Sequence, residues 1–153
     1  MIGPGKKLPA FSLPRSDGST WKTSDFTDGN LVIFFYPKAM TPGCTLEGQD
    51  FRDLHAQFRR AKTIVLGISK DSCERQAKFR AKEKFPFELL SDEDEKVCRL
   101  FDVIREKSLY GRKFMGIERS TFLFGADGKL AREWRKVRVK GHAAEVLEAA
   151  KSL

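Results

Sequence analysis

Short apolar runs alternate with amphipathic segments along this chain, a pattern typical of domains in which helices pack on a sheet. Residues 31–36 and 63–69 are almost continuously apolar, which predicts two buried strands of the kind found in parallel sheets. Residues 41–61, between them, carry apolar side chains at helical spacing, and we expect one long helix there. The residues expected on its buried face are Leu46, Phe51, Leu54 and Phe58.

A second helix, a short strand and a third helix are predicted next. Residues 71–74 (Asp-Ser-Cys-Glu) resemble a capping box, after which apolar side chains follow Cys73 at four-residue steps. Residues 87–90 form the predicted strand, and Ser91 is expected to cap the third helix. The buried side chains expected are Ala77, Ala81 and Phe85 on the second helix and Val97, Leu100, Phe101 and Ile104 on the third.

Turn signals mark both ends of the chain. Asp17-Gly18 and residues 28–30 predict turns, and the short segments between them are expected to form an N-terminal β-hairpin. Residues 120–124 and 130–139 flank a turn sequence, Ala-Asp-Gly-Lys, and predict a second antiparallel hairpin. A last helix is expected after Gly141, and its apolar face would consist of Ala143, Val146, Leu147 and Ala150.

Together these elements predict one α/β domain over residues 1–153. Strands that alternate with helices and end in a hairpin favour a central mixed β-sheet flanked by helices. We therefore expect a thioredoxin-like fold with the N-terminal β-hairpin as an extension. A chain of 153 residues is long enough to bury a core without disulfides or a structural metal.

The charge of the chain permits a nucleic-acid partner but does not favour one. The formal net charge is +8, from 29 basic and 21 acidic residues, and positive side chains are dense only over residues 132–140. A charged stripe alone indicates non-specific attraction, so no specific nucleic-acid partner is expected. The longest apolar run, residues 31–36, is too short to span a bilayer, and the N-terminus lacks a secretory signal pattern. We expect a cytoplasmic protein without membrane contact.

Three cysteines, Cys44, Cys73 and Cys98, are spaced in a way that argues against two common roles. No pair forms a C-x-x-C, and neither His55 nor His142 lies at zinc-ligand spacing, so no metal site is expected. An odd number of widely spaced cysteines does not fit a secreted disulfide framework. The cysteines are therefore either inert core residues or include at least one reactive thiol.

Cys44 lies where a predicted strand leads into a predicted helix. Thr41 is a suitable N-cap, and Pro42 suits the first helical position, so Cys44 falls in the first turn. Free backbone N–H groups and the positive end of the helix dipole stabilise a thiolate there, and the thiolate is the nucleophilic form. Cys98 borders an apolar stripe and is expected to be an inert core residue. From these residues alone, a reactive and an inert Cys44 both remain open.

A longer motif around Cys44 resembles a known enzyme family. Pro37-x-x-x-Thr41-x-x-Cys44 is similar to the active-site signature of peroxiredoxins. The run Phe35-Tyr-Pro-Lys-x-x-Thr-Pro-Gly-Cys-Thr-x-Glu-Gly resembles the subfamily called bacterioferritin comigratory protein, or peroxiredoxin Q. The similarity continues in the same order through residues 67–72, 90–94, 116–123 and 134–141, and so covers nearly the whole chain.

The resemblance implies a peroxidase that reduces hydrogen peroxide and organic hydroperoxides in antioxidant defence. Cys44 would attack the peroxide and become a sulfenic acid, which requires no metal or organic cofactor. The Thr41 hydroxyl would bond the sulfur or the peroxide, and Pro37 would cover the thiolate. Arg119 matches the family arginine that favours the thiolate and binds peroxide. Glu47 is a weaker candidate for organising the site, since it also fits a helix-surface carboxylate.

The chain departs from the family where a second, resolving cysteine is expected. The two positions at which family members carry it are Gln49 and Arg80 here. Cys73 is a possible substitute, and Cys98 is a weaker one. The leading hypothesis is that an external thiol reduces the sulfenic acid, with thioredoxin, glutaredoxin or glutathione as partner. We expect a monomer, with a dimer as the alternative.

Two other functional classes remain as alternatives. The first is a thiol-disulfide exchange protein or holdase on the same fold, although Thr41 stands where a C-x-x-C motif would have its first cysteine. The second is a basic nucleic-acid-binding module that uses residues 132–140, although no aromatic platform or known motif accompanies them.

Overall fold

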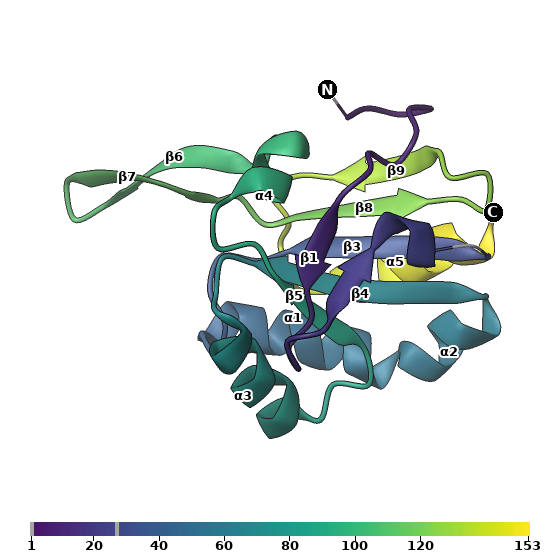
Figure 1. The fold of residues 1–153 in the computed structure, drawn as a ribbon, viewed down its shortest axis with the longest axis horizontal. Helices are drawn as coiled ribbons and strands as arrows, with labels where there is room; N and C mark the ends of the chain where they lie inside the picture. The colour runs from purple at the N-terminus through teal and green to yellow at the C-terminus, as the bar shows by residue number, and fades with distance from the viewer. Residues whose placement is uncertain (1, 27) are drawn as a thin grey trace.

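A five-stranded mixed β-sheet forms the centre of the computed structural model, which describes residues 2–26 and 28–153 (Figure 1). The strand order is β5-β4-β3-β8-β9. β3, β4 and β5 are mutually parallel, and β8 pairs antiparallel with both of its neighbours, β3 and β9. The strands are β3 (Asn30–Phe35), β4 (Thr63–Ser69), β5 (Glu88–Ser91), β8 (Ser120–Phe124) and β9 (Leu130–Trp134). This arrangement confirms the predicted mixed α/β fold, with β9 ending five residues earlier than the predicted strand to residue 139.

Different elements cover the two faces of the sheet, because alternate side chains of β3 point to opposite sides. Val32 and Phe34 pack with side chains of α1 (Pro42–Asp53), α2 (His55–Arg60), α3 (Cys73–Glu83) and α5 (His142–Lys151). Leu31 and Ile33 pack with the N-terminal hairpin and with α4 (Lys96–Leu100). Among the described residues, no helix is both long and apolar enough to cross a membrane.

The C-terminal end of the chain follows the sequence prediction, and the N-terminal end follows it in part. An N-terminal hairpin is present, but it closes around Asp17-Gly18, so only its second strand lies between the two predicted turns. β1 (Ser12–Pro14) and β2 (Thr20–Lys22) form the N-terminal antiparallel hairpin, in which Leu13 pairs with Trp21 and both side chains are buried. A 3-10 turn (Thr23–Asp25) follows it. In α5, the predicted apolar face is buried as a whole.

The long helix predicted over residues 41–61 is divided at Leu54 into α1 and α2, and its buried face is rotated from the predicted one. Leu46 is 48% exposed, whereas Cys44 and Glu47 face the core. Leu46 precedes Phe51 by five positions, which corresponds to roughly 140° around a helix, so the two side chains cannot share a face. The helical phase set by Phe51 therefore buries a carboxylate and exposes a leucine.

The second helix begins one residue later than the predicted capping box over residues 71–74 implies, and of the predicted apolar residues only Phe85, which follows the helix, is buried. Ser72 is its N-cap and accepts a hydrogen bond from the Arg75 N–H at 3.2 Å. The buried side chains are Gln76 and Phe79, while the predicted Ala77 and Ala81 are exposed. A four-residue step drifts by about 40° per repeat, so it does not follow one face for long.

The third helix is much shorter than predicted. Ser91 does not cap it, because Ser91 is the last residue of β5. The neighbouring Asp92 carboxylate accepts hydrogen bonds from the Val97 and Cys98 N–H groups, at 3.2 and 2.7 Å. Leu100 is 44% exposed, against expectation. The expected stripe residue Ile104 already belongs to the next strand.

A further hairpin, formed by β6 (Ile104–Leu109) and β7 (Arg112–Ile117), lies between the third helix and the predicted β8–β9 hairpin and was not predicted. It is a separate two-stranded sheet that projects from one end of the molecule (Figure 1). Its turn residues, Tyr110 and Gly111, both have positive φ angles, 51° and 78°, as a two-residue hairpin turn requires. Most of its side chains are exposed, so the hydrophobic pattern used for the other strands is absent here.

Gly48 lets α1 pack closely against the aromatic side chains below it. A methyl group at Gly48 would overlap the Phe85 ring. That ring has little room to move, since its centroid lies 5.0 Å from that of Phe87 and 4.9 Å from that of Phe79. This contact sets the distance between α1 and the core, and so helps to position Cys44, which lies one turn earlier in the helix.

We expect Gly48→Ala to destabilise the protein, although alanine is the better helix former. The gain in helix propensity is about 1 kcal/mol, whereas overpacking a rigid core costs about 1–3 kcal/mol. Urea unfolding should show a net loss of free energy of unfolding. Gly3→Ala is the control, because no atom lies within 4 Å of a methyl group there. A Gly48→Ala protein as stable as the wild type would contradict this packing.

Candidate active site

Cys44 lies in the first turn of α1, at the carboxyl ends of the parallel strands. β3 ends at Phe35, and the connecting loop reaches Thr41, which is the N-cap with an extended backbone (φ −88°, ψ 156°). Pro42 occupies the first helical position. Both placements confirm the sequence prediction. Cys44 is only 2% exposed, so its sulfur is enclosed by the protein at the start of the helix.

Arg119 brings a positive charge to the Cys44 sulfur from the other half of the chain. Its Nη2 lies 3.5 Å from Cys44 Sγ, and its Nη1 donates a hydrogen bond of 2.7 Å to Glu47 Oε1. Antiparallel pairing of Phe35 with Ser120 places Arg119 beside the end of β3. A methyl group at Gly43 would lie 3.2 Å from Nη2, so the glycine leaves the guanidinium its space.

Glu47 is part of this cluster rather than of the helix surface. Its side chain is 1% exposed, and its second carboxylate oxygen, Oε2, is buried without a hydrogen-bond partner among the described residues. Burial raises the pKa of Glu47 to about 7, while the charge and hydrogen bond of Arg119 oppose this rise. Burial lowers the pKa of Arg119, but Glu47 and Cys44 together outweigh that effect and raise it. The guanidinium therefore remains charged between the two groups.

Thr41 and Pro37 border the site, but their side chains do not bond the sulfur in this structure. The Thr41 hydroxyl donates to the Lys38 carbonyl oxygen at 2.8 Å and does not cap the helix. Pro37 is half-buried and follows Tyr36, whose N–H donates to the Ile68 carbonyl oxygen at 3.1 Å. The loop thus leaves the sheet at Pro37.

Asp71 and Arg75 clamp this loop from the next strand–helix connection, which the sequence did not reveal. The Ala39 N–H donates to Asp71 Oδ2 at 2.7 Å, and Arg75 Nη2 donates to the Ala39 carbonyl oxygen at 3.0 Å. Asp71 also accepts hydrogen bonds from Arg75 Nε and from the Ser69 hydroxyl. Since the contacts use the backbone of Ala39, they require no particular polar side chain at that position, and no sequence motif marks them.

The other two cysteines lie in different surroundings, and all three are free thiols. Cys73 is half-buried at the start of α3, between Asp71 and Arg75, so it shares the sheet edge with Cys44 as predicted. Cys98 is fully buried in the core on the opposite face of the sheet from Cys44. Burial, and next the Asp92 charge, raise the pKa of Cys98 strongly, so its thiol stays protonated.

Lys107, on β6, is a further cation near the site that sequence reasoning missed. It is half-buried while its strand neighbours Glu106 and Ser108 are exposed, and its chain passes over Gly116. Burial, and then the charge of Arg119, lower the pKa of Lys107, while Cys44 opposes this. Nothing in the sequence places Lys107 near Cys44, because the hairpin that carries Lys107 was not predicted.

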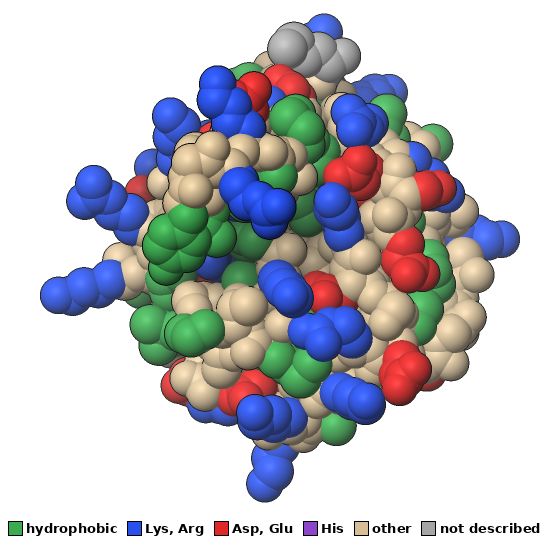
Figure 2. Space-filling view, turned by 90° about the vertical axis from the view of Figure 1, so that its left-hand side faces the viewer, with side chains coloured by type: hydrophobic (Ala, Val, Ile, Leu, Met, Phe, Trp, Pro, Cys, Tyr) green, Lys and Arg blue, Asp and Glu red, His purple; other side chains and the backbone are tan. Residues whose placement is uncertain are grey.

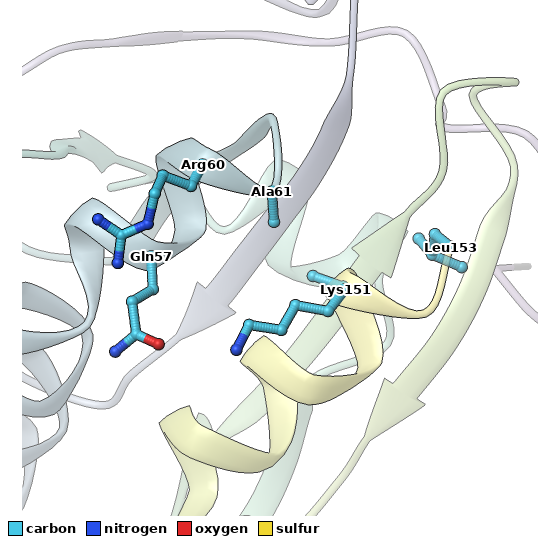
Figure 3. A pocket seen from close by; sticks show the side chains of 6 residues that line it. Gln57, Arg60, Ala61, Lys151 and Leu153 are labelled. Carbon is cyan, nitrogen blue, oxygen red and sulfur yellow. The ribbon is translucent and has the colours of Figure 1, made fainter.

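Other candidate sites offer less chemistry. The pocket in Figure 3 lies between α2 and α5, near the amino ends of β3 and β4. It is lined by Gln57, Arg60, Ala61, Ala150, Lys151 and Leu153, which include no cysteine, serine or threonine. Within residues 2–26 and 28–153 there is no cluster of His, Cys, Asp or Glu side chains that could hold a metal ion. In the basic segment 132–140, Arg132 pairs with Glu145, and Arg135 donates hydrogen bonds to the carbonyl oxygens of Phe101 and Asp102. Two of its cations are therefore already engaged within the protein.

Comparison with known proteins gives a consistent result. Residues 4–133 match the AhpC/TSA family. The chain is 46% identical over 149 residues to peroxiredoxin Bcp of Bacillus subtilis, covering 97% of this chain and 95% of that protein. It is 51% identical over 150 residues to peroxiredoxin Bcp of Xanthomonas campestris, covering 95% and 94%. A structure of the Xanthomonas campestris bacterioferritin comigratory protein superposes with a TM-score of 0.88 at 47% identity, covering 93% of this chain and 90% of that one.

The raised pKa of Glu47 predicts a pH-dependent stability. Glu47 holds its proton more tightly when folded, at a pKa of about 7, than at its ordinary value of 4.5. Its contribution to the free energy of unfolding is therefore complete below about pH 4.5 and is lost as the pH rises to about 7. A shift of this size is worth on the order of 3 kcal/mol.

We expect Glu47→Gln to remove this dependence, so that the variant loses less stability than the wild type between about pH 5 and about pH 8. Urea unfolding at both pH values measures the difference. Glu74→Gln, on the exposed surface of α3, is the matched control and should parallel the wild type. Parallel behaviour of Glu47→Gln as well would show that Glu47 has an ordinary pKa.

Proposed function

The chain belongs to the AhpC/TSA family and is a thiol-dependent peroxidase of the peroxiredoxin kind, and we propose that Cys44 is the sulfur that attacks the peroxide. The observation that carries this assignment is the contact of Arg119 Nη2 with Cys44 Sγ at 3.5 Å inside a nearly dry site. A partly buried cation beside a sulfur at a helix N-terminus stabilises negative charge on that sulfur, and the thiolate is the reactive form. Cys98 has no comparable cation, and Cys73 has no comparable burial.

The proposed reaction transfers one oxygen atom to the sulfur. The Cys44 thiolate attacks the nearer peroxide oxygen, so an S–O bond forms while the O–O bond breaks. The departing oxygen leaves with the electron pair and takes up a proton to become water or an alcohol. The sulfur is oxidised by two electrons to a sulfenic acid, and the peroxide is reduced by two. Because sulfur does the redox work, the reaction needs no cofactor.

The remaining residues of the site position the peroxide and stabilise charge. Arg119 would bind the peroxide as well as the sulfur, since its guanidinium has several donors in one plane. The Thr41 hydroxyl would exchange its bond with Lys38 for one to the peroxide or the sulfur. Pro37 would shield the thiolate from water. Glu47 orients Arg119 through the 2.7 Å ion pair, so it acts as a positioning residue.

We further propose that an external thiol restores Cys44. Gln49 and Arg80 occupy the two positions at which family members carry a resolving cysteine. The Gln49 side chain donates a hydrogen bond to Glu83 on α3, and the Arg80 side chain donates one to the Phe87 carbonyl oxygen, so both side chains link neighbouring elements. An incoming thiol attacks the sulfenic acid, water leaves, and a second thiol reduces the resulting disulfide. Thioredoxin, glutaredoxin and glutathione are the reductant candidates. A disulfide between Cys44 and Cys73 is the less favoured route.

Substrate and setting follow from the same premise. The related Xanthomonas campestris protein is described by its alkyl peroxide reduction activity. We propose that this chain reduces both hydrogen peroxide and organic hydroperoxides, as an antioxidant enzyme of the cytoplasm. One domain over residues 1–153 suffices for this reaction, and a monomer, rather than a dimer, is the proposed state.

Arg119→Ala should slow the peroxide step by about 10²-fold, because one preorganised charged donor at the reacting atoms is lost. Stopped-flow mixing with peroxide, under single-turnover conditions, measures the rate. Arg59→Ala, at an exposed arginine of α2, is the matched control and should react like the wild type. Cys44→Ser sets the baseline of no reaction. An unchanged rate for Arg119→Ala would remove Arg119 from the proposed site.

The recycling route predicts which products form after one equivalent of peroxide. Under one-cysteine recycling, mass spectrometry should find Cys44 as sulfenic acid, or as an adduct with added thiol, with Cys73 and Cys98 still reduced. Cys73→Ser should then turn over as fast as the wild type with an external thiol. A Cys44–Cys73 disulfide, together with slow turnover of Cys73→Ser, would refute the external-thiol route and leave the role of Cys44 intact.

A further inference from the structure

The β6–β7 hairpin, residues 104–117, has its base in the core, at Ile104 and Ile117, and an exposed outer part; we call the hairpin the arm. Within the described part of the chain it pairs with no other strand, and its outer part stands away from the sheet and helices (Figure 1). Four large apolar side chains are exposed on it, among them Tyr110 at 96%. The four are Leu109, Tyr110, Phe114 and Met115. Large apolar side chains gathered on one exposed element mark an interaction surface more often than scattered ones do.

The arm is also strongly basic. It carries four cations and one carboxylate, Glu106, over fourteen residues. The cations are Arg105, Lys107, Arg112 and Lys113. Arg105 is engaged by Asp102 at its base, whereas Lys113 makes only an exposed contact of 3.6 Å with Glu106. The outer part of the arm therefore offers apolar area and positive charge together.

The arm leads directly into the active site. Two residues after its last residue, Ile117, the chain reaches Arg119, which contacts Cys44. Lys107 of the arm lies close enough for Arg119 and Cys44 to influence its pKa. Figure 2 looks onto this end of the molecule, where hydrophobic side chains surround a hollow with Lys and Arg side chains next to it. A macromolecule bound to the arm would thus lie beside the oxidised sulfur.

We propose that the arm is the docking surface for a protein dithiol that reduces oxidised Cys44, and that this partner presents an apolar contact face bordered by carboxylates. The inference rests on the proposed function, because it assumes that Cys44 forms a sulfenic acid. Charge complementarity selects an acidic partner and disfavours a second copy of this chain, whose own formal net charge is +8. The apolar side chains supply contact area, and the cations set orientation and association rate.

The chemistry at the docked complex balances with a dithiol as the two-electron donor. The first thiolate of the partner attacks the sulfenic sulfur of Cys44, an S–S bond forms, and hydroxide leaves and is protonated to water. The second thiol of the partner then attacks this mixed disulfide and forms a disulfide within the partner. Cys44 departs as thiolate, which is the state that reacts with peroxide again.

The test reverses the charge of the outer arm with Arg112→Glu and Lys113→Glu in one protein. The matched control is Arg59→Glu with Arg60→Glu, which changes the net charge equally at the exposed end of α2. Turnover is measured with thioredoxin plus its reductase, with glutaredoxin plus glutathione, with glutathione alone and with dithiothreitol. Leu109→Ser with Tyr110→Ser tests the apolar part separately.

We expect both arm variants to lower kcat/KM for the preferred protein dithiol by about tenfold or more, and the charge variant to lose most of its dependence on salt. Their dithiothreitol turnover and single-turnover peroxide rates should equal those of the wild type and the control. Unchanged protein-dithiol kinetics would overturn the proposal. So would glutathione alone matching the protein dithiols, or a dimer in sedimentation that the arm variants dissociate. A wild-type protein that fails to consume peroxide with dithiothreitol would instead overturn the role proposed for Cys44.

Discussion

The partly buried guanidinium of Arg119, held between the Cys44 sulfur and the Glu47 carboxylate, is the interaction around which the rest of the site is built. A charge in a nearly dry site is costly unless opposite charges and hydrogen bonds lie within contact distance. Here one nitrogen contacts the sulfur and another contacts the carboxylate. The same desolvation that makes this cluster costly makes its electrostatic effect on the sulfur strong, because water does not screen it. Loss of Arg119 would leave the Glu47 carboxyl group, whose side chain is 1% exposed, without its charged partner.

The fold supplies the constraints that this cluster needs. Cys44 and Glu47 are one helical turn apart on the buried face of α1, so both point toward the same space. The antiparallel pairing of β3 with β8 brings Arg119 to that space from a distant part of the chain. Gly43 gives the guanidinium room, and Gly48 lets α1 pack close to the core. The site is therefore a property of the packed sheet and helix, since none of these contacts exists within a single segment.

Enclosure of the sulfur separates two tasks that a peroxidase of this kind must combine. Cys44 is 2% exposed, so a small peroxide fits such a site better than a large molecule does, and the protein reductant that we propose would have to approach from outside. The loop that leads to Cys44 is held by Asp71 and Arg75. The arm, which is basic and exposes apolar side chains, ends two residues before Arg119. Chemistry is thus concentrated in the interior, and recognition is left to the surface elements beside it.

The sequence by itself determined the alternation of strands and helices, the N-cap at Thr41 and the placement of Cys44 in the first turn, because these depend on local spacing and local backbone preference. The family resemblance, rather than any local rule, singled out Arg119. Tertiary structure alone decided that Glu47 is buried while Leu46 is exposed, that Cys98 lies across the sheet from Cys44, and that the arm exists as a hairpin. The reason is physical: sequence periodicity gives the repeat of a helix or strand, but the neighbours packed against it decide which polar groups find partners. Glu47 lies on the buried face because Phe51 sets the phase of the helix, and it finds a charged partner there because Arg119 arrives from 72 positions away in the chain.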